Sequence, residues 1–312
     1  MTRAEVSPTP HITAAALFPV AVLGLIWGCN WPVLKMGVNE IAPLTFRAVT
    51  LPFAAIGMLA IARLSGDSIR IARPLWGKVA LLALFNIAGW NGLLLFGLQQ
   101  LPAGRSAILG FTMPVWTVLF SLGLLHEPLS TRKLAGMALG ILGMGVLLGE
   151  DIRHVERAPT AALFILGASI SWAFGTVLLR KWKLSVPQNA LSGWMMLVGW
   201  LPLAVLAPIV APGPPVMPSA SAWFAILYNI FLAGMFGHWA WFTLARTLPV
   251  AVSSMSSLPV PIVGVFAGML VLGERPGPAE WTALALVVAA MIAVLWTPRA
   301  ETAPPAPDNQ GL

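Results

Sequence analysis

Charged side chains are scarce in this sequence. Only 9% of the 312 residues are Asp, Glu, Lys or Arg, whereas 58% are apolar and the mean hydropathy is +0.85. A typical soluble domain carries about 25% charged residues, so this composition excludes one and indicates an integral membrane protein. Nucleic-acid binding is excluded as well, because the basic residues form no cluster on a fold that would present them to phosphates.

Cysteine and histidine are nearly as scarce, which limits the chemistry open to the chain. The single cysteine, Cys29, excludes an intrachain disulfide and a cysteine-based metal cluster. The four histidines are scattered without ligand spacing, at His11, His126, His154 and His238. A membrane-embedded enzyme acting on lipid intermediates needs a metal cluster, a His/Asp constellation or an activated nucleophile. We therefore expect no enzyme activity, no catalytic residues, no metal and no cofactor.

Carboxylates are missing from the interior of the predicted spans, since all eleven acidic residues fall in loops or at span ends. Ion- and proton-coupled carriers usually hold ionisable groups deep in the membrane. The sequence places only one ionisable side chain, His238, well inside a span. Its position fits two roles equally well, a neutral histidine bonded to a backbone carbonyl or a contact with the substrate. A role as the sole proton carrier fits less well. The sequence leaves ion coupling, like the oligomeric state, open.

Apolar runs of about 20 residues, long enough to cross a bilayer as a helix, occur ten times. We predict spans at 13–34, 44–63, 75–98, 103–125, 133–149, 160–180, 188–210, 222–245, 249–272 and 279–297. A polar N-terminal segment, 1–12, precedes them. The proline-rich tail 298–312 follows, and its composition predicts disorder.

One stretch of the sequence, Leu101–Glu127, recurs at Leu248–Glu274. The two copies align without a gap, and both place a proline near the middle of an apolar run, Pro114 in one and Pro261 in the other. A proline inside a helix removes a backbone hydrogen bond and bends the helix, which a membrane span tolerates where neighbours satisfy the freed carbonyl. We predict hinges at Pro114 and Pro261; two ordinary kinked helices are the alternative.

The first spans of two halves, 13–150 and 160–297, correspond as well. Trp27 aligns with Trp172, and Lys35 aligns with Arg180. Because each half has five spans, the second starts on the opposite side of the membrane, as in the inverted repeats of many transporters. Twelve of the 18 basic residues then fall on the side that holds both termini, so both termini are predicted to be cytoplasmic.

Most polar side chains inside the spans are uncharged and lie close to tryptophans in the sequence. Asn86 and Trp90 are four residues apart and share one helix face, and Tyr228, the only tyrosine, is set inside a span. Packing or an interfacial belt is the alternative for any single tryptophan, but the clustering favours a lined cavity. The candidate substrate-binding residues are Trp27, Asn30, Asn86, Trp90, Asn91, Tyr228, His238 and Trp239. A group of four serines fits two roles equally well, lining the cavity or forming contacts between helices. Its members are Ser253, Ser254, Ser256 and Ser257.

Four charged residues at span ends are expected to serve the structure. Glu127 and Glu274 sit near helix ends, where carboxylates are stabilising. Lys35 and Arg47 are expected to extend to the membrane interface rather than to attract an anionic group.

The chain resembles a known family over about residues 13–297. The ten spans, the opening GLIWGCNWPVLK and the paired segments LP…P…HEP and LP…P…GE look like EamA-type transporters of the drug/metabolite transporter superfamily, and most of all like bacterial YddG-type amino-acid exporters. The resemblance implies a basket of helices in which spans 1, 3, 4, 6, 8 and 9 line a central cavity. Arg47 departs from the repeat, since the corresponding position in the second half is Ser192.

These observations predict an all-α integral membrane protein with ten transmembrane helices, arranged as two inverted five-helix repeats around a central cavity. We expect a bacterial inner-membrane exporter of amino acids, apolar or aromatic ones favoured, that works by alternating access. Its partners would be a small-molecule substrate and the lipid bilayer. A drug or organic-cation exporter of the same superfamily is the nearer alternative, although such carriers typically use an intramembrane carboxylate. A phosphate-sugar carrier would want basic residues in the cavity.

Overall fold

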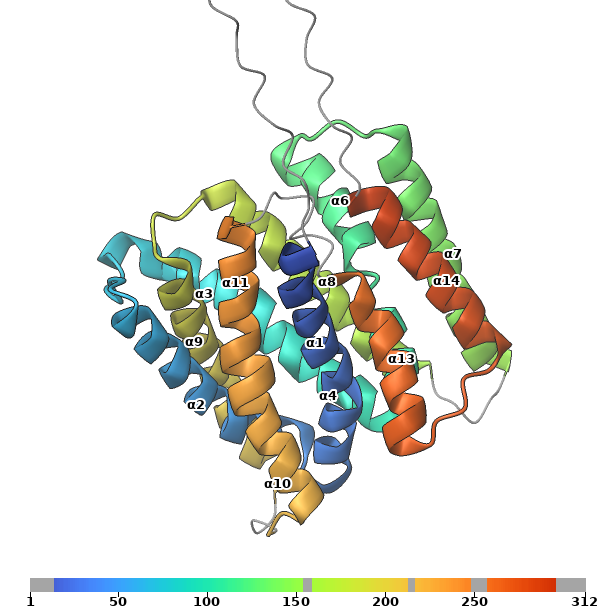
Figure 1. Ribbon diagram of the computed structural model, residues 1–312, viewed down its shortest axis with the longest axis horizontal. Coiled ribbons are helices and arrows are strands. Elements are labelled where there is room, and N and C mark those ends of the chain that lie inside the picture. The colour runs from blue at the N-terminus through green and yellow to red at the C-terminus, as the bar shows by residue number, and fades with distance from the viewer. Residues whose placement is uncertain (1–13, 154–158, 213–216, 248–256, 296–312) are drawn as a thin grey trace, which may run out of the picture.

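The computed structural model describes residues 14–153, 159–212, 217–247 and 257–295, and every regular element in these ranges is helical (Figure 1). The predicted terminal segments, 1–12 and 298–312, lie outside the described residues. So do three of the four serines, Ser253, Ser254 and Ser256. Within these ranges, nine helical stretches are long and apolar enough to cross a membrane, and Pro259–Leu272 is a shorter apolar helix. The described part of the chain is therefore all-helical, with nine candidate membrane spans.

The helices of the first half follow the predicted spans, with ends shifted by a few residues. The largest shift is in the first helix, which runs six residues past the predicted end at 34. The third and fourth spans are each divided into segments. The elements are α1 (Ala14–Glu40), α2 (Pro43–Leu64), the 3₁₀ turn η1 (Arg73–Leu75), α3 (Trp76–Ala83), the π-helical η2 (Leu84–Gly89), α4 (Trp90–Gln100), α5 (Ala103–Gly110), α6 (Met113–Leu125) and α7 (Thr131–Arg153).

The second half repeats this order, and its third span is again interrupted by a π-helical segment. Its elements are α8 (Thr160–Trp182), α9 (Gln188–Val210), α10 (Ala220–Leu227), the π-helical η3 (Tyr228–Phe236), α11 (Gly237–Thr247), α13 (Pro259–Leu272) and α14 (Pro278–Leu295).

The two halves interlock instead of forming separate bundles. The most extensive helix pairings join α2 to α9, α7 to α14 and α1 to α13, while α8 packs against α4 and α6. Figure 1 shows α7 and α14 side by side at one edge, with α1, α13 and α8 nearer the middle. In every pair, one helix comes from each half of the chain. The core is consequently a single interface between the halves.

Small residues allow the α7–α14 pair to approach closely. A Cβ added at Gly136 would lie 3.0 Å from the carbonyl oxygen of Ala290, and one at Gly143 would lie 3.4 Å from that of Ala283. In a bilayer, where burial in lipid costs an apolar side chain nothing, such close packing is a main source of helix association. This explains why α7 carries glycine on the face that meets α14.

Both predicted hinge prolines stand at the start of a helical segment. Helix α5 ends at Gly110, residues 111–112 form a turn, and α6 begins at Met113 with Pro114 in its first turn. The missing N–H of proline costs nothing at that position. Pro261 is buried in the first turn of α13. The fourth span is thus broken next to Pro114, while the use of either proline as a hinge stays a prediction.

Candidate functional site

Two π-helical segments occupy corresponding places in the two halves. Segment η2 carries Asn86, and η3 carries Tyr228 and Asn229. Each packs against the first helix of the other half, η2 against α8 and η3 against α1. π-Helical turns inside α-helices are frequent at functional sites. The sequence carried no signal for them beyond the polar residues that they contain.

The contact between η3 and α1 gathers three of the predicted site residues. The Tyr228 hydroxyl donates to the Ile26 carbonyl at 2.7 Å, and the Trp27 Nε1–H donates to the Ala233 carbonyl at 3.3 Å. The Trp27 ring meets His238 of α11 edge-on, with ring centroids 5.8 Å apart. Aromatic and hydroxyl groups of both halves therefore meet at one place.

His238 is tied to the backbone of its own helix. Its Nδ1 lies 2.8 Å from the Gly234 carbonyl oxygen and 3.2 Å from that of Ala233. Because a carbonyl only accepts, Nδ1 carries the proton. This geometry fits one of the two alternatives for His238, a histidine bonded to a backbone carbonyl, and contact with a substrate stays a prediction.

The contact between η2 and α8 mirrors the first one. The Asn86 amide donates to the Trp172 carbonyl at 3.3 Å and to Thr176 Oγ1 at 3.4 Å, and its own oxygen, Oδ1, accepts no hydrogen bond from the described residues. The Trp90 ring packs against Trp172 with centroids 5.3 Å apart. Gly175 makes room, since a Cβ there would lie 2.0 Å from Asn86 Oδ1. The aligned residues Trp27 and Trp172 thus each contact the π-helical segment of the opposite half.

The other predicted residues separate from these two groups. The Asn91 amide donates to the Ile87 carbonyl of its own helix at 2.9 Å. Trp239 is 38% exposed and packs against Phe236, lining an apolar groove on the outer surface. Asn30 is half-buried one turn after Trp27, and its Oδ1 has no hydrogen-bond partner among the described residues. Across the described residues, no hydrogen bond or ring contact links the Trp27 group with the Asn86 group.

Arg47 contradicts the expectation that it extends to the interface. Its side chain is only 7% exposed, and its Nη1–H donates to Asn229 Oδ1 of η3 at 3.1 Å. The guanidinium carbon lies 5.7 Å from the ring centre of Phe46. The prediction that His238 is the only ionisable group well inside a span is therefore wrong. Residues around Arg47 are apolar, so the sequence did not show which way it turns.

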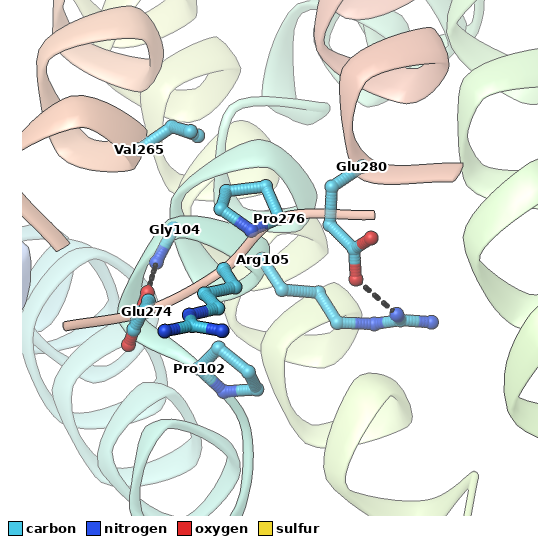
Figure 2. Close-up of a pocket in the computed structure, with 8 residues that line it drawn as sticks. Pro102, Gly104, Arg105, Val265, Glu274, Pro276 and Glu280 are labelled. Carbon is cyan, nitrogen blue, oxygen red and sulfur yellow. Dashed lines mark hydrogen bonds and ion pairs between the residues drawn. The ribbon is translucent and has the colours of Figure 1, made fainter. Parts of the chain in front are cut away.

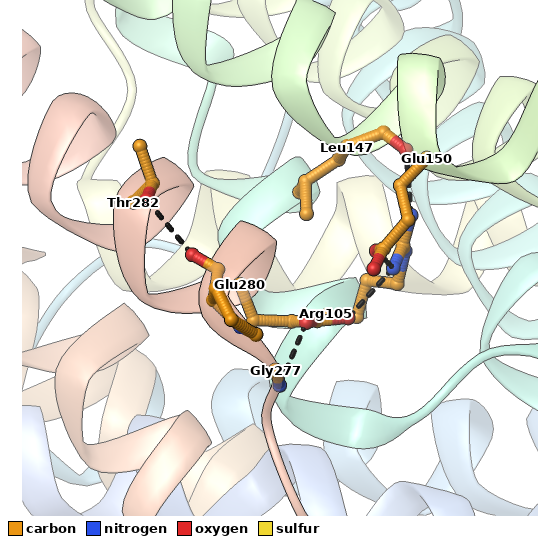
Figure 3. A network of polar contacts seen from close by, with 7 residues as sticks. Arg105, Leu147, Glu150, Gly277, Glu280 and Thr282 are labelled. Carbon is orange, nitrogen blue, oxygen red and sulfur yellow. Dashed lines mark hydrogen bonds and ion pairs between the residues drawn. The ribbon is translucent and has the colours of Figure 1, made fainter. Parts of the chain in front are cut away.

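A second polar cluster joins the two halves at one end of the helices. Arg105 of α5 is buried, and its Nη1 lies 2.7 Å from Glu150 Oε2 and 2.6 Å from Glu280 Oε1 (Figure 3). Its Nη2 donates to the Leu147 carbonyl at 2.6 Å. The Glu280 carboxylate also accepts from the Gly277 amide at 2.9 Å. Four segments of the chain are fixed by this one network.

Glu274 completes that cluster by capping a helix of the other half. Its carboxylate accepts from the backbone amides of Ala103 and Gly104, the first residues of α5 (Figure 2). A carboxylate at a helix N-terminus is stabilised by the unpaired amides and the helix dipole. Gly104, Arg105 and Glu274 line a cavity of about 240 Å³.

Glu127, which aligns with Glu274 in the repeat, has different partners. Its carboxylate lies 3.0 Å from Lys133 Nζ and 2.6 Å from Arg180 Nη2. The hydrogen bond from the Lys133 ammonium, together with the charge of Arg180, holds the pKa of Glu127 below its usual value. Both glutamates therefore make structural contacts, as expected, with partners that the sequence did not predict.

Comparison with known proteins agrees with this architecture. The model of the EamA-like transporter family matches residues 14–149 and again residues 159–296. The uncharacterized inner membrane transporter YedA of Escherichia coli (strain K12) is 29% identical over 87% of this chain and 88% of its own. A solved structure titled "Crystal structure of protein" matches 90% of this chain and 97% of its own with a TM-score of 0.63 and 21% identity.

Two further relatives have names that state a cargo. A probable amino-acid metabolite efflux pump of Salmonella typhimurium is 24% identical over 88% of this chain and 92% of its own. An S-adenosylmethionine/S-adenosylhomocysteine transporter of Chlamydia trachomatis is 24% identical over 88% and 86%. With two matches that together span nearly the whole chain, this protein belongs to the EamA-like transporter family.

Proposed function

We propose that the protein is an inner-membrane exporter of amino acids, with apolar or aromatic ones favoured, that works by alternating access. The observation that carries the proposal is the pair of π-helical segments, each of which meets a tryptophan of the other half. Such an arrangement places neutral polar groups and aromatic faces at the boundary between two interlocked halves. A site at a repeat interface is the expected place for a transporter cargo.

The proposal includes ten spans in two inverted repeats, with α13 and the residues before it as the ninth. The helix pairings support this arrangement. When each helix is replaced by its counterpart in the other half, the α1–α13 pair becomes the α8–α6 pair, which is also observed. The α2–α9 and α7–α14 pairs each consist of two counterparts, so the replacement leaves them unchanged. A pseudo-twofold axis in the membrane plane relates inverted repeats in the same manner.

Orientation follows from the distribution of basic residues and is part of the proposal. With both termini in the cytoplasm, the cluster of Arg105, Glu150, Glu274 and Glu280 lies at the external end of the helices. Its contacts fasten α5, α7 and α14 together.

Amino acids suit the groups at the two contacts. Tryptophan faces suit an apolar or aromatic side chain, while amides and hydroxyls suit the charged ends of a zwitterion. The efflux-pump relative carries amino-acid metabolites by name, and S-adenosylmethionine, named for the other relative, also contains an α-amino-acid group. Both names therefore support a cargo with an α-amino-acid group.

An organic-cation exporter is less well supported. Each of the carboxylates Glu127, Glu150, Glu274 and Glu280 is bound to a basic side chain or a helix N-terminus. A buried arginine near η3 would also repel a cation.

Counterflow in proteoliposomes tests the proposal. Vesicles that contain the purified protein and unlabelled phenylalanine should accumulate labelled phenylalanine, and threonine should compete less well. Protein-free vesicles give the background, and a quaternary ammonium cation tests the rival function. If the vesicles exchange the cation and none of the amino acids, the amino-acid proposal is wrong.

A further inference from the structure

Arg47 is a buried cation with no carboxylate beside it in the part of the chain that the structure describes. Only 7% of its surface is exposed. Among the described residues, it forms no ion pair within 4.0 Å. One polar partner is present, Asn229 Oδ1, at 3.1 Å from Nη1. Its Nε is buried and donates to no acceptor in the described part of the chain.

Such an arrangement is costly unless a negative charge joins it. A buried charge needs a partner and further hydrogen bonds before burial is offset, and arginine inside a membrane typically marks a substrate or ion pathway. By comparison, the other buried arginine, Arg105, has two carboxylates and a carbonyl around it. Among the described residues, Arg105 is therefore neutralised by carboxylates, and Arg47 has no counter-charge within 4.0 Å.

We propose that Arg47, held in place by Asn229, binds the carboxylate of the cargo. This proposal rests on the proposed export function and names the group of the cargo that is recognised. The guanidinium is planar and matches a carboxylate with two parallel N–H donors. Asn229 belongs to η3, the segment that also carries Tyr228 and contacts Trp27. The anchor therefore shares the segment η3 with groups already assigned to the cargo.

The same chain offers acceptors for the other end of a zwitterion. The buried oxygens Asn30 Oδ1 and Asn86 Oδ1 accept no hydrogen bond from the described residues. An ammonium group donates three hydrogen bonds and accepts none. The spare N–H donors of Arg47 suit a carboxylate better than a cation or a neutral sugar. A purely structural arginine that ties α2 to η3 would need only the Asn229 bond.

The decisive variant is Asn229→Asp, which places a carboxylate where Arg47 now meets an amide oxygen. The aspartate loses the bond from the Asn229 amide to the Ala225 carbonyl, 3.0 Å long, but gains a charged partner in Arg47. We expect a folded protein in which the new carboxylate, introduced by Asn229→Asp, already binds Arg47 and so excludes the carboxylate of the cargo. Exchange of phenylalanine should fall by about 10- to 150-fold, the range for one hydrogen bond to a charged group.

Selectivity separates the anchor from a structural role. The wild type should exchange phenylalanine at least about tenfold better than phenylalanine amide, which lacks the carboxylate. In Asn229→Asp and in Arg47→Gln this preference should disappear. Asn189→Asp is the matched control, because Asn189 is also buried with a free Oδ1 but begins α9, away from η3. It should keep the preference of the wild type.

Three results would overturn the anchor. One is wild-type exchange of phenylalanine and its amide at equal rates, which leaves the export function standing. Another is an unchanged preference in Asn229→Asp. If no amino acid is exchanged at all, the export function fails, and a binding measurement then tests the anchor by itself. The probe is 3-phenylpropionate, a carboxylate without an ammonium group, which should raise the melting temperature of the wild type and not that of Asn229→Asp. No such rise would remove the anchor as well.

Discussion

The Arg105 guanidinium and the Glu280 carboxylate meet at 2.6 Å, although 175 residues separate them in the sequence. Both side chains are nearly buried, at 0% and 12% exposure. Arg105 belongs to the first half of the chain and Glu280 to the second, so this ion pair, with Glu150 on its other side, fastens the two halves at one end.

Removal of Arg105 should destabilise the protein far more than removal of an exposed pair. Arg105→Met leaves Glu150 and Glu280 without their cation, and breaking a buried pair in this manner costs about 3–5 kcal/mol. Thermal unfolding in detergent measures the loss. Arg180→Met is the control, since Arg180 is 54% exposed and pairs with Glu127, and such a pair contributes about 0–1 kcal/mol. Equal melting temperatures for the two variants would contradict the assignment.

The Glu127 pair should make a small, pH-dependent contribution to stability. Because the hydrogen bond from Lys133 and the charge of Arg180 lower the pKa of Glu127 in the folded protein, the contribution is present above the ordinary carboxyl pKa. It is lost as the pH falls through the lowered pKa. The melting temperatures of wild type and Glu127→Gln should therefore differ at pH 7 and converge in acid. A difference that grows in acid would mean that the sign is wrong.

The proposed topology can be tested with two engineered cysteines in a Cys29→Ala background. Ser68 lies in the exposed link between α2 and η1, and Ala211 follows α9 and is exposed. Five proposed spans separate them, and five is odd. A membrane-impermeant maleimide added to cells should label Ala211→Cys directly and Ser68→Cys only after lysis. Labelling of both from one side would refute the ten-span arrangement.

Pro114 should affect the rate of transport more than the affinity for cargo. In Pro114→Ala, the new amide N–H is positioned to bond to the Gly110 carbonyl, which would join α5 and α6 into one helix. If the break lets the halves rearrange, the maximal rate falls while the half-saturating concentration changes little. Pro261→Ala should act likewise at the start of α13.

Pro52→Ala is the matched control for both hinge variants. Pro52 lies inside α2, which packs along α9, and it has no counterpart in the repeated segment. Its replacement should leave the rate unchanged. Wild-type rates in Pro114→Ala and Pro261→Ala would make these two prolines ordinary helix starts.

The sequence determined the helical fold well because hydropathy and repeat alignment are local signals. The limits of α9 coincide with the predicted 188–210, since turn residues bound that span on both sides. The partners of buried charges were less accessible. Arg47 lies near a predicted helix start, where extension to the interface is usual, and only its packing against η3 turns it inward. Glu274 meets Ala103 and Gly104 across 170 residues or more, which no spacing rule reveals.

The division of the site residues has the same cause. Trp239 follows His238 directly, but adjacent residues on a helix point in different directions, so one meets Trp27 and the other faces outward. Periodicity gave no sign of the two π-helical segments, because a widened turn depends on what packs against it.

A further prediction concerns the contact between Asn86 and α8. A methyl group at Gly175 would lie 2.0 Å from Asn86 Oδ1 and would push this side chain out of place. Gly175→Ala and Asn86→Ala should therefore each reduce the exchange of every amino acid by about 5- to 150-fold, because each removes one polar partner. Gly167→Ala, on the same helix, meets only the end of the Leu93 side chain at 3.3 Å, so its exchange rate should stay close to that of the wild type.

Trp90→Ala should have a different effect, because Trp90 offers an aromatic face and no free polar group is assigned to it. Its ring packs against Trp172, and an aromatic pair contributes about 0.5–1.5 kcal/mol beyond the area that it buries. Loss of the ring should weaken phenylalanine and tryptophan more than threonine, which changes the order of preference among cargoes. Competition counterflow with these three amino acids measures that order. If all three weaken equally, Trp90 supports the fold of η2 and α4 and does not contact the cargo.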